Sequence, residues 1–226
     1  MRLITVPGVF RPRSDSHMLA AVGAERVRPE MTVLDPFTGS GILALSAARA
    51  GARAVSAVDV SRRAVACAWL NGRLNGVRVR TLRGDMFAPV RGERFDLILA
   101  NPPYLPGEEG SGPRGATRAW EGGRNGRALL DRLCDEAAQQ LTPDGVLILV
   151  QSSVCGLDTT LDRLADAGLR GEVLIRERGP LGPLLAARAE QLERRGLIAP
   201  GQRQEEIQVI HAAHAGHGSG VRRRVA

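Results

Sequence analysis

The sequence predicts an α/β protein built around a mainly parallel, doubly wound sheet. Short runs of apolar and β-branched residues alternate along the chain with longer segments of helical character, and this alternation requires crossover connections between parallel strands. At 226 residues the chain is long enough for one sizeable core. Its content of 43% hydrophobic and 24% charged residues is typical of a globular protein and not of a disordered one. We therefore expect a single main domain.

The first half of the chain contains three expected strands and two expected helices. Residues 32–35 form a short apolar run that predicts a buried strand, and the small and apolar residues 41–50 predict a helix after it. Residues 54–59 predict a second strand. The helix that follows, over residues 61–74, begins at Ser61 as its N-cap. Residues 77–82 predict a third strand.

The second half continues the alternation with four more strands and three more helices. The apolar run of residues 95–100 predicts the fourth strand, and the Pro143-Asp144-Gly145 turn separates the next helix from the fifth strand. The expected strands of this half are residues 95–100, 146–151, 172–176 and 206–211, and the expected helices are residues 127–141, 157–167 and 184–194.

Two segments fall outside this alternation. Residues 102–123 are rich in Pro and Gly, which predicts a long loop, and long loops inside compact domains are usually functional. Residues 212–226 are of low complexity and are expected to form a disordered tail. The tail carries His214 and His217, but a flexible segment cannot hold ligand geometry, so we expect no metal site. The expected organisation is an extension with a first helix over residues 1–30, a main domain over 31–211, and the tail.

The charged residues exclude some functions and leave others open. All 31 residues counted as Lys or Arg are Arg, so neither a Schiff-base lysine nor the phosphate loop of P-loop nucleoside triphosphatases is present. The formal net charge is +7, and residues 49–94 hold ten Arg against three acids. Such a surface either faces a polyanion or reflects a coding bias toward Arg, and charge alone does not decide between them.

The cysteines and the hydropathy pattern indicate a protein of the reducing cytoplasm. Cys67, Cys134 and Cys155 are widely spaced and odd in number, which argues against a disulfide framework and against a zinc site. No window approaches 18 consecutive apolar residues, and the first residues lack the pattern of a signal peptide. We therefore expect no association with a membrane.

Three strand ends predict a site for a cofactor that contains a nucleoside. The first strand runs into Asp35-Pro36-Phe37-Thr38-Gly39-Ser40-Gly41, where Gly39 and Gly41 permit a tight turn and a close approach of the backbone to a ligand. The same glycines could instead serve helix packing. Asp59 ends the second strand, where an acid can accept hydrogen bonds from both hydroxyls of a ribose, although it could also cap the next helix.

The third strand is followed by Gly84-Asp85-Met86-Phe87. Here an acid can accept a hydrogen bond from an adenine amine while an apolar side chain packs on the face of the ring. An ordinary turn aspartate is the alternative interpretation of Asp85. Because the carboxyl ends of parallel strands meet at one edge of a sheet, we expect these residues to lie around one crevice.

The fourth strand ends in Asn101-Pro102-Pro103-Tyr104. Two prolines restrict the backbone, so the Asn101 side-chain oxygen and the Pro102 carbonyl are held beside the only tyrosine of the chain. This array can accept both N–H groups of a planar amine or amide while Tyr104 stacks on the flat group. A rigid loop with an exposed ring is the structural alternative.

These motifs resemble those of class I S-adenosylmethionine-dependent methyltransferases, and within them the HemK family of glutamine N5-methyltransferases that modify release factors. The resemblance extends from about Val9 to His211. It rests on Phe10-x-Pro12-x-x-Asp15-Ser16, on Arg94 to Tyr104, and on Trp120-Glu121-Gly122-Gly123-x-x-Gly126. It implies a seven-stranded Rossmann-like sheet with the last strand antiparallel.

The resemblance also implies roles for individual residues. Asn101, Pro102 and Tyr104 are implied at the methyl acceptor, with S-adenosyl-L-methionine as the cofactor. The residues implied at the cofactor are Asp15, Asp35, Thr38, Gly39, Gly41, Asp59, Val60, Asp85, Met86 and Asn101.

The expected substrate is a protein glutamine on a translation release factor. The short segment before the first strand resembles the archaeal and eukaryotic branch of the family, whose eukaryotic members work with a small zinc-binding activator subunit. The Asp35-Pro36-Phe37 opening is common in nucleic-acid amine methyltransferases. Methylation of an exocyclic amine in DNA or RNA, or of a small-molecule amine, therefore stays open as the alternative, as does a cofactor-binding subunit whose partner supplies catalysis.

Overall fold

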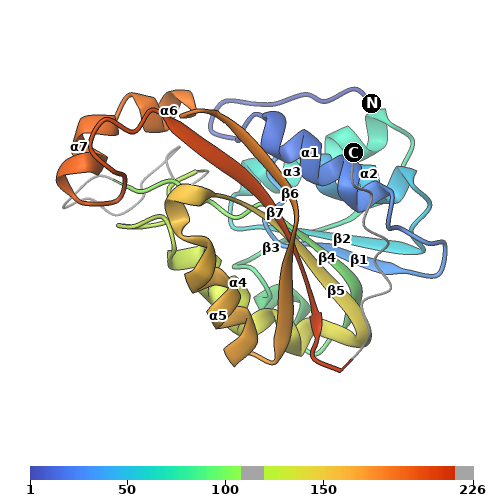
Figure 1. Ribbon diagram of the computed structural model, residues 1–226. Coiled ribbons are helices and arrows are strands. Elements are labelled where there is room, and N and C mark those ends of the chain that lie inside the picture. The colour runs from blue at the N-terminus through green and yellow to red at the C-terminus, as the bar shows by residue number, and fades with distance from the viewer. Residues whose placement is uncertain (108–119, 217–226) are drawn as a thin grey trace.

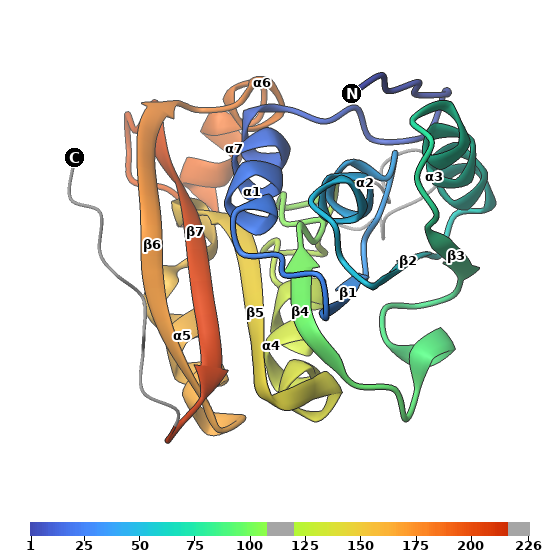
Figure 2. The same ribbon diagram turned by 90° about the vertical axis from the view of Figure 1, so that its right-hand side faces the viewer.

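The computed structural model describes residues 1–107 and 120–216, which form a seven-stranded sheet in the order β3-β2-β1-β4-β5-β7-β6 (Figures 1 and 2). β7 pairs antiparallel with both of its neighbours, and the other neighbouring strands of this sheet pair in parallel. The strands are β1 Thr32–Asp35, β2 Ala54–Asp59, β3 Arg80–Arg83, β4 Phe95–Ala100, β5 Leu141–Ser152, β6 Leu169–Pro180 and β7 Gln204–His214. The Rossmann-like sheet with an antiparallel last strand is confirmed.

Helices cover both faces of the sheet (Figure 2). Leu19 of α1 and Leu43 of α2 belong to the core on one face, and Leu130 of α4 and Leu164 of α5 belong to the core on the other. Burial of these apolar side chains is the main stabilising contribution to such a fold. The helices are α1 Ser14–Ala24, α2 Ile42–Arg49, α3 Arg62–Leu74, α4 Ala128–Gln140, α5 Leu157–Asp166, α6 Pro183–Ala186 and α7 Ala189–Arg194.

Most of the predicted elements occur where the sequence placed them. The observed bounds of β1, β2 and β4 are the predicted ones. The predicted cap of α3 is confirmed, because the Ser61 hydroxyl accepts a hydrogen bond of 3.3 Å from the Ala64 amide. Both observations follow from local signals: a short apolar run between turns for the strands, and a capping side chain for the helix.

Several predicted elements differ in extent, β6 and β7 among them, since both are longer than predicted. β3 begins at Arg80, three residues later than predicted. The predicted turn at residues 143–145 lies inside β5. The register of pairing between β4 and β5 shifts between Phe95 and Leu97, so residues 143–145 form an irregularity within β5. The predicted helix over residues 184–194 is divided into α6 and α7, because Arg188 leaves the helical region with φ of −115°.

β6 and β7 extend past the end of β5. β5 pairs with β7 only as far as Ser152 opposite Ile207, whereas β6 and β7 stay paired to Pro180 opposite Gln204. The segment between them, residues 181–203, carries α6 and α7 and a small core of its own (Figure 1). Leu105, from the loop after β4, packs against this small core. This segment, together with the paired ends of β6 and β7, is called the β6–β7 arm, and it lies over the edge of the sheet where β4 ends.

The expected start of the tail at residue 212 is wrong. β7 continues to His214, because Ala212 and Ala213 pair with β5 on one side and with β6 on the other. Residues 217–226, which contain His217, lie outside the described residues. Among the described residues no helix is long and apolar enough to cross a membrane, and no cluster of three potential metal ligands is found in that part of the chain.

Candidate active site

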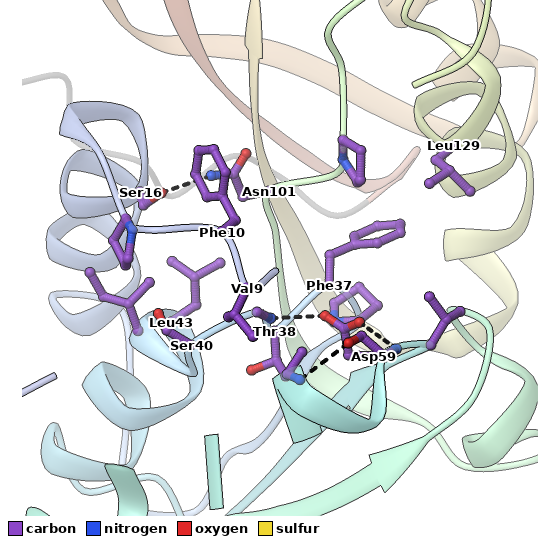
Figure 3. A pocket seen from close by; sticks show the side chains of 18 of the residues that line it. Val9, Phe10, Ser16, Phe37, Thr38, Ser40, Leu43, Asp59, Asn101 and Leu129 are labelled. Carbon is purple, nitrogen blue, oxygen red and sulfur yellow. Dashed lines mark hydrogen bonds between the residues drawn. The ribbon is translucent and has the colours of Figure 1, made fainter. Parts of the chain in front are cut away.

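A cavity of 280 Å³ opens at the carboxyl ends of β1, β2 and β4 (Figure 3). Four loops contribute to its walls, and the N-terminal segment adds Val9 and Phe10. The predicted site residues that line it are Thr38, Gly39, Asp59, Val60, Asp85, Met86 and Asn101. The convergence of strand ends that are distant in sequence on one crevice is confirmed.

Asp35 is not part of the cavity wall. It is fully buried beneath the loop, where its Oδ2 atom accepts hydrogen bonds from the Thr38 hydroxyl at 2.8 Å and the Ala44 amide at 3.2 Å. Burial raises the pKa of this carboxyl group to about 7, against the opposing effect of these hydrogen bonds. Asp35 therefore holds the turn in shape and connects it to α2, a role different from the predicted contact with a cofactor.

The two predicted glycines have different roles. Gly39 lines the cavity, and a Cβ atom added there would meet no atom within 4 Å. Gly41 has φ of 92°, and an added Cβ would lie 2.7 Å from Leu45 and 3.1 Å from the backbone of Ala68. Gly39 therefore leaves room for a ligand, whereas Gly41 permits the packing of α2 against α3. Both interpretations of the Gly-x-Gly pattern apply, each to one residue.

Asp59 presents a carboxylate that is already oriented by the backbone. Its Oδ2 atom accepts a hydrogen bond from the Gly39 amide at 3.0 Å, and its Oδ1 atom accepts one from the Ser61 amide at 2.9 Å. Burial raises the pKa of Asp59, and these two hydrogen bonds oppose that shift. Each oxygen keeps further lone pairs for a ligand. The neighbouring Val60 is half-exposed beside it.

Asp85 and Met86 close the far end of the cavity. Asp85 forms an ion pair of 3.0 Å with Arg132 of α4, and both side chains are about half exposed. Met86 is buried with φ of 47°, the one positive φ outside glycine among the described residues. Such a backbone conformation is unfavourable for a side chain of this size and is typical of functional sites.

The residues present fit S-adenosylmethionine. The Ser40 hydroxyl lines the cavity and is buried without a hydrogen-bond partner among the described residues, so it can bond a polar ligand. Asp59 offers two oxygens to vicinal hydroxyls, and Val60 lines the same cavity. Phe37 and Leu129, labelled in Figure 3, supply further apolar surface for a flat ring. The cavity thus has a polar end, an acceptor for the two sugar hydroxyls and an apolar end for the ring, which are the features that this ligand requires.

Asn101 is fixed in one orientation by residues of α1. Its Nδ2 atom donates to the Ser16 hydroxyl at 3.0 Å and to Asp15 Oδ2 at 3.3 Å (Figure 3 shows the Ser16 bond). These two bonds fix the orientation of the amide, and its Oδ1 atom has no hydrogen-bond partner among the described residues. An oriented and available acceptor is therefore present at the end of β4.

Tyr104 is held by the same carboxylate. Its hydroxyl donates to Asp15 Oδ2 at 2.8 Å. Burial and then the Asp15 carboxylate raise the pKa of Tyr104 well above its ordinary value, so the phenol stays protonated as a donor. Asp15, predicted as a cofactor residue, is absent from the wall of the first cavity and lies instead between the two side chains predicted at the acceptor.

A second cavity of 430 Å³ lies on the other side of Asn101. Phe10, Asn101 and Pro103 line both cavities. The second one is bounded by Pro102, Tyr104 and the β6–β7 arm, and its charged lining residues are Arg13, Asp15, Glu177 and Glu205. It also contains Trp120, whose Nε1 atom is buried without a hydrogen-bond partner among the described residues.

Sequence reasoning missed several residues of the site. Ser16 belongs to the N-terminal motif and Ser40 lies between two glycines, but neither is among the predicted site residues. Glu205 lines the second cavity and is buried, with one oxygen accepting from the Gly182 amide at 2.6 Å and the other from the Ser152 hydroxyl. No local signal marks Glu205, because its partners lie on other elements.

Comparison with known proteins identifies the family. Residues 1–113, half of the chain, match the model described as the methyltransferase small domain. A protein of Methanocaldococcus jannaschii named for protein N5-glutamine methyltransferase activity is 33% identical over 187 residues, covering 82% of this chain and 93% of that protein. The release factor glutamine methyltransferase of Moorella thermoacetica is 39% identical over 156 residues, and the match covers 63% of this chain but only 54% of that enzyme.

Solved structures agree on the fold. The Mtq2–Trm112 complex of E. cuniculi, responsible for the methylation of the termination factor eRF1, superposes with a TM-score of 0.64 at 19% identity, covering 92% of this chain and 99% of the matched chain. A 16S rRNA N2 G1207 methyltransferase of T. thermophilus, in complex with AdoMet and guanosine, gives a TM-score of 0.59 at 22% identity, covering 93% of this chain and 46% of that one. The family match, the archaeal relative and this fold together show that the chain belongs to the HemK-type methyltransferases of the methyltransferase small-domain family.

Proposed function

We propose that this protein is an S-adenosylmethionine-dependent N-methyltransferase that modifies the side-chain amide of a protein glutamine, on a translation release factor. The observation that carries this proposal is the orientation of Asn101: its nitrogen is held by Asp15 and Ser16. Its oxygen is therefore presented as an acceptor between the two cavities. An acceptor at that point suits a neutral nitrogen group that bears N–H donors.

Alignment of the reacting atoms is the main task of the protein in this reaction. When bound, S-adenosylmethionine supplies a methyl group on a positively charged sulfur, so that a carbon–nitrogen bond forms as the carbon–sulfur bond breaks and one proton leaves the nitrogen. Asp59 in the first cavity would hold the sugar of the cofactor, and Tyr104 in the second would contact the acceptor side chain. Asn101 lies where the cavities meet.

Asn101 and Pro102 lower the barrier by electrostatics. An amide nitrogen is a weak nucleophile because its lone pair is delocalised into the carbonyl group. If the Asn101 Oδ1 atom and the Pro102 carbonyl oxygen each accept one N–H, they stabilise the positive charge that develops on the nitrogen, which is worth about 3 kcal/mol for one such group in related cases. The unpartnered Trp120 Nε1 group is available to donate to the carbonyl oxygen of the same amide.

The charges of the second cavity favour a protein amide over nucleic acid. Three carboxylates and one guanidinium line it, so a phosphate backbone meets net repulsion there. The Arg-rich segment of residues 49–94 contributes none of its Arg side chains to that cavity. It extends from α2 to β4 and includes β3, the strand at the opposite edge of the sheet from β6. The positive charge and the acceptor cavity are therefore on different parts of the molecule.

The decisive experiment incubates the protein with S-adenosylmethionine that carries a labelled methyl group and with one of three acceptors. The acceptors are release factor, the same factor with Gln→Glu at the glutamine found to be methylated, and DNA or RNA. We expect label on the release factor, mass spectrometry placing one added methyl group on a glutamine, and no label on the Glu variant. Label on nucleic acid at a comparable rate would instead establish the exocyclic-amine alternative, which the formal net charge of +7 favours.

We also propose a small activator subunit. Two observations support it: similarity to the Mtq2 chain of the Mtq2–Trm112 complex, and three large apolar side chains of α3 that are exposed, namely Trp69, Leu70 and Leu74. Exposed apolar clusters are common at protein interfaces. Co-expression with candidate small partners from the same organism should raise soluble yield and turnover, and full turnover by the isolated chain would contradict the need for one.

A further inference from the structure

The first twelve residues, which we call the N-terminal strap, run along α3 toward the start of α1, with a turn at residues 7–9 (Figures 1 and 2). Gly8, Val9, Phe10 and Pro12 line that cavity. Figure 3 shows Val9 near Thr38, and Phe10 near Asn101. The strap therefore forms a wall of the cavity that comes from outside the Rossmann-like fold.

Two asparagines of the α3 region hold the backbone of the strap. Asn75 accepts from the Arg2 amide at 2.9 Å and donates to the Arg2 carbonyl at 2.7 Å. Asn71 accepts from the Ile4 amide at 2.9 Å and donates to the Ile4 carbonyl at 2.8 Å. Each asparagine thus bonds both polar groups of one strap residue, as a neighbouring strand would.

The spacing of these pairs matches the geometry of the two segments. Four residues of α-helix rise about 6 Å, and two residues of extended chain rise about 6.6 Å. Asparagines at i and i+4 therefore meet alternate residues of an extended segment with little adjustment. Because all four bonds involve backbone atoms of the strap, this recognition depends on its extended conformation and not on its side chains.

Asn71 also connects the strap to the loop after β1, which lines the first cavity. It is fully buried, and its Nδ2 atom donates a second hydrogen bond of 2.9 Å to the Ser40 carbonyl. Further along the strap, Arg63 of α3 donates to the Pro7 carbonyl at 3.2 Å. The contacts thus follow the strap from its first residues to the edge of the cavity.

We propose that Asn71 and Asn75 are positioning residues that hold the N-terminal strap closed over the bound cofactor, and that the strap detaches from α3 to admit the cofactor and release the product. This inference rests on the proposed function only in that the cofactor occupies the first cavity. Phe10 lines both cavities, so a closed strap also keeps the acceptor side chain aligned with the cofactor beside Asn101.

The test leaves α3 and the Ser40 contact unchanged. The double variant Arg2→Pro with Ile4→Pro removes the two strap N–H donors, because proline has none. Thr5→Pro is the matched control: it stiffens the same segment at a residue whose N–H has no hydrogen-bond partner among the described residues. The full-length chain and its variants are compared by the dissociation rate and affinity of S-adenosylhomocysteine, and by hydrogen exchange at the strap amides with and without that ligand.

We expect the double variant to release S-adenosylhomocysteine about tenfold faster than the wild type, with the Thr5→Pro rate within twofold. Bound S-adenosylhomocysteine should slow hydrogen exchange at the amides of residues 8–11 in the wild type. In the double variant the ligand should not slow this exchange. Asn75→Ala, which is less disruptive to folding, should show a smaller change in the same direction. Equal release rates in all proteins would overturn the proposal, as would an equal acceleration by Thr5→Pro. If the wild type does not bind the ligand, the proposed function itself is wrong.

Discussion

The two cavities are held together by different kinds of contact. In the glycine loop after β1, on the cofactor side, the organising bonds join residues close in sequence: Asp35 to Thr38 spans 3 residues, and Asp59 to Gly39 spans 20. On the acceptor side they are remote, since Asn101 bonds Asp15 across 86 residues and Tyr104 bonds the same residue across 89. Local contacts can be inferred from a motif, whereas remote ones depend on how α1 packs against the sheet. The comparison predicts that variants on the acceptor side lower kcat, whereas a variant on the cofactor side weakens the affinity for S-adenosylmethionine.

The largest expected effect is at the junction of the two sides. Asn101→Ala removes the oriented acceptor, so kcat should fall by about 10³-fold, the effect of removing one preorganised group at a charged transition state. The affinity for S-adenosylmethionine should stay within a few-fold, because Asp59 and the glycine loop are unchanged. The measurement is steady-state kinetics together with calorimetric titration. Turnover close to that of the wild type would refute the role of Asn101.

Asp15→Asn tests the remote contact that orients Asn101. An amide in place of the carboxylate presents its own N–H groups to Asn101 Nδ2 or to the Tyr104 hydroxyl, so kcat should fall by about 10²-fold, as with other misplaced catalytic groups. Cofactor affinity should stay within twofold, because Asp15 does not line the first cavity. The sequence-based prediction of Asp15 as a cofactor residue gives the opposite result, a weaker affinity with little change in kcat.

Asp35 gives the cofactor side a contribution to stability that decreases as pH rises. Its pKa is raised from 3.8 to about 7 in the folded protein, so the folded state binds a proton more tightly than the unfolded state. Its contribution to stability is therefore fully present below about pH 4 and is lost as pH rises toward 7. Relative to Asp35→Asn, the wild type should lose about 2 kcal/mol of unfolding free energy between pH 5 and pH 8.

Urea unfolding of both proteins at several pH values measures this difference. The asparagine side chain can still accept from the Thr38 hydroxyl and the Ala44 amide, so the variant is expected to fold and to serve as its own control. A difference in unfolding free energy that is constant across this pH range would show that Asp35 does not titrate there.

The smallest expected effect is at Asp59, which is the counterpart of Asp15 on the cofactor side. Asp59→Asn replaces one oxygen by an NH2 group that faces the Gly39 or Ser61 amide. The dissociation constant for S-adenosylmethionine should rise about tenfold, equivalent to about 1.4 kcal/mol, while kcat at saturating cofactor changes less than threefold. A loss of kcat without a change in affinity would reverse the assignment of the two acids.

Much of the fold followed from local patterns. Residues 32–35, 54–59 and 95–100 are short apolar segments between turn signals, and their observed bounds are the predicted ones. Patterns failed where long-range pairing decided the result. β6 and β7 pair with each other beyond the end of β5, so both strands are longer than their own sequences indicate. Residues 143–145, predicted as a turn, lie within β5.

The sequence by itself determined which residue types come to the carboxyl edge of the sheet: an acid and glycines after β1, an acid after β2, and Asn101-Pro102-Pro103-Tyr104 after β4. It could do so because the alternation of strands and helices dictates which ends meet. The tertiary structure alone decided what these residues do there. Asp35 supports a turn, Gly41 permits helix packing and Asp15 orients Asn101, because each of these roles depends on neighbours supplied by another element. The same reason applies to the strap, whose backbone is recognised by asparagines 67 and 73 residues away.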